Sequence, residues 1–168
     1  IFHEQYDKAL TLIESIIEKD NQDLDMLRME CFIMKNRYDK VIEHIETLIN
    51  DQCEYLESIF EYIAPLLGDM EMNTEAHDFV NRGLMIFPEN LILLDELCYN
   101  LEIEGNIQEA IKISNQLIDK NPYSYEYWFT LGRLHSINGE FDKAIEAFDF
   151  ALTCDNSDDE LKILKAYC

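Results

Sequence analysis

The residues that most often carry enzyme chemistry are scattered along this sequence and form no recognised catalytic motif. Its four histidines are His3, His44, His77 and His135. None stands four residues from another, and no glycine-rich phosphate loop is present. Serines such as Ser58 have no histidine and aspartate in a known arrangement around them. We therefore expect a non-enzymatic protein without a cofactor, with His135 at a packing position and His44 and His77 on solvated helix faces.

Neither the cysteines nor the carboxylates have the spacing of a metal site. The five cysteines are an odd number without a CxxC pair, which argues against a zinc site and against a disulfide framework. They are Cys31, Cys53, Cys98, Cys154 and Cys168. Two acidic segments, residues 20–25 and 155–160, lack the glycine and glutamate that a calcium-binding EF-hand loop requires. We expect no metal, helix caps within the acidic segments, and reduced thiols in a cytoplasmic protein.

The composition excludes several classes of protein. Hydrophobic residues make up 48% of the 168, which is too many for an intrinsically disordered chain. The chain carries 13 Lys and Arg against 35 Asp and Glu, a net charge of −22, so it should repel nucleic acids and anionic membranes. No apolar run approaches the roughly 18 residues of a membrane span. Five glycines and three prolines also disfavour a turn-rich all-β fold.

A helical pattern recurs about every 34 residues. A small or branched residue marks the same position in five amphipathic segments, with spacings of 32, 35, 34 and 34. These marker residues are Ala9, Val41, Ala76, Ala110 and Ala144. A second amphipathic segment precedes the marker in each full period. The pattern predicts a repeated helix–turn–helix unit.

Glycine and proline punctuate these units. Gly105 and Gly139 stand where the first helix of a unit should end, in the left-handed conformation that glycine tolerates. Pro88 and Pro122 follow second helices and cannot continue them. In the last full unit we expect Gly132 to let the two helices approach closely.

At these positions the chain resembles the tetratricopeptide repeat (TPR) family. The last full copy carries the family's pattern in Trp128, Leu131, Gly132, Gly139, Phe141, Ala144, Phe148 and Ala151. The resemblance covers the whole chain and implies an all-α TPR solenoid, a right-handed superhelix of antiparallel helix pairs. The first helix of each pair would line the concave face. Residues 121–132 look especially like bacterial TPR proteins of the Bacteroidetes type.

The repeat register divides residues 1–168 into a single solenoid with a partial repeat at each end. The segments are 1–21 (second helix), 22–56, 57–90, 91–124, 125–158 and 159–168 (first helix). Both ends therefore cut a repeat, so we expect part of a longer protein. Apolar residues at the ends, Ile13 with Ile16 and Ile163 with Leu164, should be partly uncovered and could pair end to end. Pro65 should kink or shorten its helix.

The resemblance implies a scaffold that binds a partner protein along the concave groove. Projection of the repeat register places carboxylates and aromatic side chains there: Glu61, Tyr62, Asp95, Glu96, Tyr99, Glu102, Glu126, Phe129 and Arg133. The cationic clamp of some TPR domains is absent, so a basic or amphipathic segment fits better. Three alternatives stay open: a merely solvated acidic face, a self-assembling structural module, and a regulatory arm of a larger protein.

Overall fold

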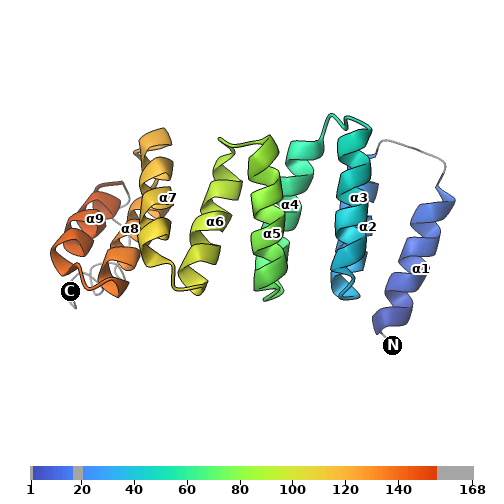
Figure 1. Cartoon of the computed structure of the whole chain (residues 1–168), viewed down its shortest axis with the longest axis horizontal. Helices are drawn as coiled ribbons and strands as arrows, with labels where there is room; N and C mark the ends of the chain where they lie inside the picture. Colours follow the sequence, from blue (N-terminus) through green and yellow to red (C-terminus); the bar gives the residue numbers. More distant parts are fainter. Residues whose placement is uncertain (1, 17–20, 155–168) are drawn as a thin grey trace. The chain divides into compact units, whose positions relative to one another are not determined.

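The structure is a computed structural model that describes residues 2–16 and 21–154 (Figure 1). These described residues form nine α-helices and no strand, which confirms the all-α prediction. The chain divides into two compact units, residues 1–88 and 89–168, and each is described by itself. None of the described helices is long and apolar enough to cross a membrane. The predicted partial repeat at 159–168, with Ile163 and Leu164, lies outside the described residues.

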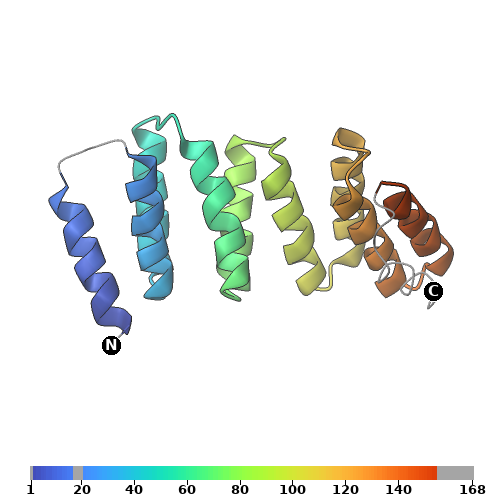
Figure 2. The ribbon, with the colours of Figure 1, turned by 180° about the vertical axis from the view of Figure 1, so that it is seen from behind.

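The first unit consists of one helix followed by two helix pairs. Its helices are α1 (Phe2–Ser15), α2 (Gln22–Met34), α3 (Tyr38–Asn50), α4 (Leu56–Asp69) and α5 (Asn73–Ile86). Seen from behind, α2 lies in front of α3 and α4 in front of α5 (Figure 2). Asn21 caps α2, because its side-chain oxygen accepts a 3.1 Å hydrogen bond from the Leu24 amide. The acidic segment at 20–25 thus contains a helix cap, as predicted.

The core of the first unit is built on aromatic and branched side chains. Phe60 is fully buried, and its ring centroid lies 4.8 Å from that of Phe79 and 6.1 Å from that of Phe87. The markers Val41 and Ala76 are fully buried as well. Ile13 is buried, contrary to our expectation for this end, whereas Ile16 keeps 44% of its surface exposed. Ile13 therefore belongs to the core.

Pro65 does not shorten its helix. We expected Pro65 to kink or shorten its helix, and the shortening is excluded, because α4 runs through Pro65 to Asp69 and spans 14 residues. Proline removes one backbone hydrogen bond from the helix. Buried side chains on the same helix, among them Ile63, Ala64 and Leu67, have no exposed surface. Their packing compensates for the lost bond and holds the helix together.

The second unit contains two helix pairs. They are α6 (Leu91–Ile103) with α7 (Ile107–Lys120), and α8 (Tyr125–Ile137) with α9 (Phe141–Cys154). Asn90 caps α6 through a 3.0 Å bond from the Leu93 amide, and Ser124 accepts a bond from the Tyr127 amide at the start of α8. Asn and Ser are both residue types that favour this capping position.

Gly132 lies at a very close approach between α8 and α9. A Cβ atom added at Gly132 would stand 2.4 Å from two ring carbons of Phe148, which is itself 2% exposed. The markers Ala110 and Ala144 are fully buried on α7 and α9. The structure thus confirms the predicted role of Gly132 in helix packing.

The turn between the helices of each pair contains one residue in the left-handed region. Gly105 and Gly139 have φ angles of 78° and 77°, which confirms their predicted place at a helix end. Asn36 and Glu71 occupy the equivalent turns of the first unit, with φ angles of 55° and 57°. A residue with a Cβ atom pays about 1–2 kcal/mol for this conformation. Glu71 is therefore a strained position.

We expect Glu71→Gly to stabilise the first unit by about 0.5–1 kcal/mol. Glycine adopts the left-handed conformation without strain, although its greater freedom in the unfolded chain offsets part of the gain. Urea unfolding monitored by circular dichroism measures the change. Asp69→Gly is the matched control, since Asp69 lies within α4 and glycine there should destabilise the helix by up to about 1 kcal/mol. Destabilisation by both variants would contradict the assigned strain.

Candidate partner-binding face

One face of the second unit is formed by α6 and α8. Charged side chains of the two helices form two pairs on this face, and both pairs have the same sequence separation. Glu102 on α6 forms an ion pair with Arg133 on α8, 31 positions further along the chain. Asp95 and Glu126 are separated by the same 31 positions, and the two carboxylates repel each other. We name the surface formed by Asp95, Tyr99 and Glu102 of α6 with Glu126, Phe129 and Arg133 of α8 the α6–α8 face.

The α6–α8 face holds carboxylates under mutual repulsion. Desolvation raises the pKa of Asp95, and the nearby Glu126 carboxylate raises it further. Burial and the charges of Asp95 and Glu126 raise the pKa of Tyr127 in the same way. The pKa of the Cys98 thiol rises to about 12 through burial, with Asp95 and Glu102 adding to the effect. Burial is the largest cause of all three shifts, and the charges of neighbouring carboxylates add to each of them.

The two aromatic residues of the α6–α8 face differ in exposure. Tyr99 leaves 48% of its surface exposed. Phe129 is half-buried, stacks on Tyr125 with ring centroids 5.8 Å apart, and lies 6.2 Å from the ring of Phe148. Phe129 thus contributes largely to packing, whereas about half of the Tyr99 side chain is open to solvent.

The nine predicted groove residues belong to different units. Glu61 and Tyr62 lie on α4 in the first unit, where Tyr62 is 44% exposed and Glu61 is half-buried. The charge of Glu30 on α2, followed by burial, raises the pKa of Tyr62. The other seven lie in the second unit, with Glu96 half-buried on α6. Arg133 is not an open anion site, since Glu102 already neutralises it.

A buried ionic cluster in the first unit is absent from the sequence predictions. Asp25 is 7% exposed and accepts hydrogen bonds from Arg28 at 3.1 Å and from the Tyr55 hydroxyl at 2.8 Å. The Nε2 atom of His44 lies 2.8 Å from the same carboxylate. We name Asp25, Arg28, His44 and Tyr55 the Asp25 cluster. It connects α2, α3 and the turn before α4, so its role is to position these elements.

The prediction of a solvated His44 was wrong. Its side chain is only 14% exposed, and burial lowers its pKa despite the neighbouring Asp25 charge. Asp25 is buried, so its charge needs partners from other elements. His44 supplies one of them from a position 19 residues away.

His135 occupies the packing position that the sequence predicts. It is buried, and its Nδ1 atom lies 2.8 Å from Glu140. Lys143, Asn138 and His135 bond to Glu140 and lower the pKa of that carboxyl to about 2. The histidine therefore stabilises the turn between α8 and α9.

Candidate metal ligands do not gather within the described part of the chain. No group of three or more His, Cys, Asp or Glu side chains in residues 2–16 and 21–154 is placed to hold a metal ion. Cys31, Cys53, Cys98 and Cys154 are free thiols, and the first and third of these are buried. The acidic segment 155–160 and Cys168 lie outside the described residues.

Comparison with known proteins places the chain among helical repeat proteins. The sequence model of the tetratricopeptide repeat matches residues 115–146. A search of curated protein sequences gives no match to the chain. Among solved structures, YrrB, a TPR protein described as having an unusual peptide-binding site, has a TM-score of 0.69 and 15% identity. That match covers 98% of this chain and 85% of YrrB.

Two further solved structures have the same fold. A TPR protein from Parabacteroides merdae has a TM-score of 0.68 and 15% identity over 84% of this chain and 56% of its own. The first TPR of Spaghetti (RPAP3), solved with the HSP90 peptide SRMEEVD, has a TM-score of 0.62 and 13% identity over 66% of this chain and 88% of its own. The helix pairs, the matched repeat and these structures agree that the chain has the tetratricopeptide-repeat fold and resembles bacterial TPR proteins.

Proposed function

We propose that the chain is a non-enzymatic scaffold whose α6–α8 face binds a basic or amphipathic segment of a partner protein. The observation that carries this proposal is the pair of carboxylates Asp95 on α6 and Glu126 on α8: desolvation raises the pKa of Asp95, and the Glu126 charge raises it further. A positive charge bound beside both carboxylates would relieve the repulsion. A cation that binds between Asp95 and Glu126 is therefore attracted by both carboxylates, whereas an anion is repelled.

The surroundings of the two carboxylates favour a Lys or Arg side chain. Tyr99 offers an exposed ring against which the apolar stem of a Lys or Arg can pack, with a cation–π contact. Arg133, the one cation of the α6–α8 face, is neutralised by Glu102 and so repels an incoming cation less. The ligand should therefore place basic and apolar side chains in alternation along α6 and α8.

The fold supports a role in protein binding. Solved TPR structures of similar fold include one with a bound HSP90 peptide and one described as having a peptide-binding site. A basic ligand distinguishes the present proposal from the acidic peptide of the RPAP3 complex.

We expect a fluorescein-labelled peptide of alternating Lys and Leu to bind the chain more tightly than a peptide with Gln in place of Lys. In Asp95→Asn/Glu126→Gln the affinity should fall at least tenfold, because both carboxylates that attract the basic side chains are neutralised. Fluorescence anisotropy at low and high salt measures both effects, and salt should weaken the wild-type complex.

Asp119→Asn/Glu146→Gln is the matched control for this experiment. Asp119 on α7 and Glu146 on α9 are exposed, and the control changes the net charge by the same amount. An equal loss of affinity in both double variants would show attraction by net charge alone. The acidic face would then only solvate the protein, and the proposal would fail.

A further inference from the structure

The exposed apolar side chains of α6 lie in a line along the helix. They are Ile92, Tyr99 and Ile103, which are 43%, 48% and 44% exposed, and we name them the α6 stripe. We infer that the basic partner segment binds as an amphipathic α-helix whose apolar side packs on the α6 stripe, an assignment that rests on the proposed function of the α6–α8 face. It adds the conformation and the sequence pattern of the ligand.

The three side chains of the α6 stripe form one surface. At 3.6 residues per turn, they fall within about 40° of one another around the helix axis. Single exposed apolar side chains are ordinary on a protein, whereas several in line offer a surface on which another molecule can pack. Asp95 and Glu102 lie about 60–80° around the axis from Ile92, both in the same direction. That direction is toward α8, because Glu102 pairs with Arg133.

The spacing within the α6 stripe matches a helical ligand and not an extended one. Ile92 and Tyr99 are seven residues apart, and Tyr99 and Ile103 are four apart, which corresponds to about 10.5 Å and 6 Å along the axis. Side chains on one side of an extended chain repeat about every 7 Å, so they miss the longer interval. A helix that crosses α6 at a shallow angle has the same rise per residue and presents apolar side chains at both intervals.

The charges beside the α6 stripe favour a basic helix. Asp95 lies next to the stripe on the side of α8, and the charge of Glu126 on α8 acts on it. A Lys or Arg beside the apolar side of the ligand helix can lay its stem on apolar surface and bring its charge to these carboxylates. The ligand helix therefore pairs an apolar stripe with basic residues along one flank.

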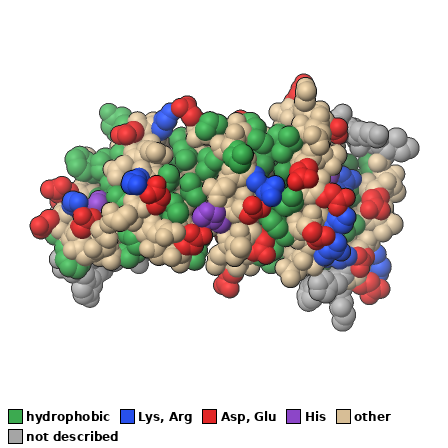
Figure 3. Space-filling view, in the orientation of Figure 1, with side chains coloured by type: hydrophobic (Ala, Val, Ile, Leu, Met, Phe, Trp, Pro, Cys, Tyr) green, Lys and Arg blue, Asp and Glu red, His purple; other side chains and the backbone are tan. Residues whose placement is uncertain are grey.

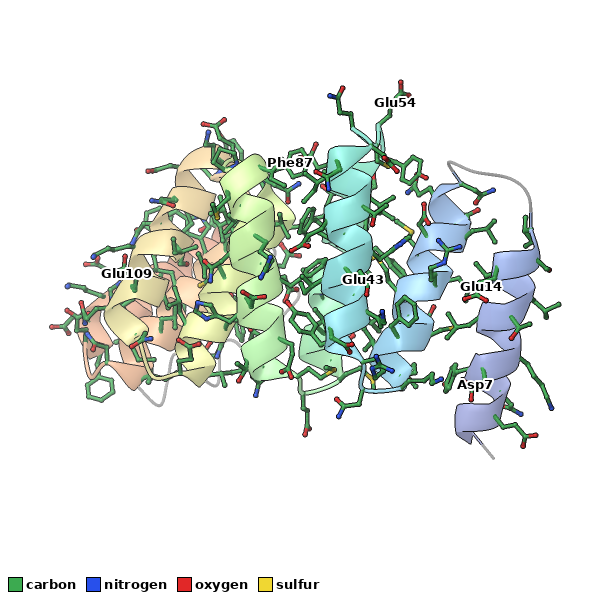
Figure 4. The ribbon with its side chains drawn as sticks, turned by 45° about the vertical axis from the view of Figure 1, so that its right-hand side comes forward. Asp7, Glu14, Glu43, Glu54, Phe87 and Glu109 are labelled. Carbon is green, nitrogen blue, oxygen red and sulfur yellow. The ribbon has the colours of Figure 1, made fainter. Side chains whose placement is uncertain are left out.

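A second copy of the chain is a poor occupant of the α6 stripe. The chain has a net charge of −22, so a second copy would bring further carboxylates against Asp95 and Glu126. Figure 3 shows Asp and Glu side chains over much of the visible surface. Figure 4 shows acidic side chains on helices of both units, among them Glu43 on α3 and Glu109 on α7. The occupant is therefore a basic segment of another protein.

The experiment compares two fluorescein-labelled peptides of identical Leu, Lys and Ala composition on the full chain. The helix-pattern peptide has Leu at its first, fifth, eighth and twelfth positions, which serves a ligand helix in either direction along α6, with Lys beside them. The alternating peptide places the same Leu residues at every second position. We expect the helix-pattern peptide to bind at least tenfold more tightly, measured by fluorescence anisotropy.

Ile92→Gln/Ile103→Gln should weaken binding of the helix-pattern peptide at least tenfold, because two of its three apolar contacts are lost while Asp95 and Glu126 remain. The matched control is Tyr123→Gln/Phe141→Gln, which removes two exposed apolar side chains elsewhere in the second unit. Its loss should be no more than about twofold. If Ile92→Gln/Ile103→Gln does not fold by circular dichroism, Ile103→Gln alone replaces it, with an expected threefold loss.

The outcomes separate the helical ligand from the proposed function. Equal binding of the two peptides, or equal losses in the two double variants, would overturn the helical ligand. If Asp95→Asn/Glu126→Gln still weakened both peptides, the α6–α8 face would keep its proposed function with a ligand of another conformation. Binding that responds neither to these carboxylates nor to the α6 stripe would refute both.

Discussion

Gly132→Ala is expected to destabilise the second unit by about 3 kcal/mol. The added methyl group would stand 2.4 Å from ring carbons of Phe148, a distance that requires α8 and α9 to move apart or the ring to leave its position. The ring is almost completely buried, so it has little room to move. Overpacking of a core by one group costs about 1–3 kcal/mol, and the severity of this overlap places the change at the upper end.

Chemical unfolding followed by tryptophan fluorescence measures this loss, because the chain's single tryptophan, Trp128, lies on α8. Phe148→Leu provides the double-mutant test, since a smaller side chain leaves space for the methyl group. We expect the double variant to be more stable than the sum of the two single changes predicts. Wild-type stability in Gly132→Ala would show that the helices do not meet as described, because alanine is otherwise the better helix residue.

Asp25→Ala is expected to destabilise the first unit by about 3 kcal/mol. The substitution removes the common acceptor of Arg28, His44 and Tyr55 and leaves these half-buried groups without it. Removal of one partner from a buried ionic cluster costs about 3–5 kcal/mol, and the partial exposure of Arg28 reduces the expected loss to the lower end of that range. Thermal and urea unfolding followed by far-ultraviolet circular dichroism measure the change.

Asp23→Ala is the control for the Asp25 cluster. Asp23 is an exposed aspartate in the first turn of the same helix, so its replacement should cost no more than about 0.5–1 kcal/mol through the helix dipole. If the two alanine variants were equally stable, the Asp25 cluster would contribute nothing to the first unit, and the account of its role would be wrong.

The helix pairs and their turns could be predicted because their determinants are local. Gly105 and Gly139 mark helix ends by a conformational preference that needs no tertiary contact, and both have the predicted positive φ. Gly132 was identified from its place in the repeat, and the close approach of Phe148 explains the need for glycine there.

Predictions failed where distant residues compensate for a local feature. Pro65 alone suggests a shortened helix, but the buried side chains around it keep α4 intact. His44 alone suggests a solvated surface, but Asp25, 19 residues earlier, draws it into a buried cluster. Each of these partners is set by the fold.

The central claim is that the α6–α8 face binds a basic segment, and crosslinking from Tyr99 tests it most directly. A photoreactive phenylalanine analogue in place of Tyr99 should crosslink Lys- and Arg-rich peptides from an extract of the organism that encodes the chain. The same analogue in place of Tyr123, which is 86% exposed elsewhere in the second unit, is the control and should capture few of them. Equal capture at both positions, or crosslinked peptides poor in Lys and Arg, would contradict the claim.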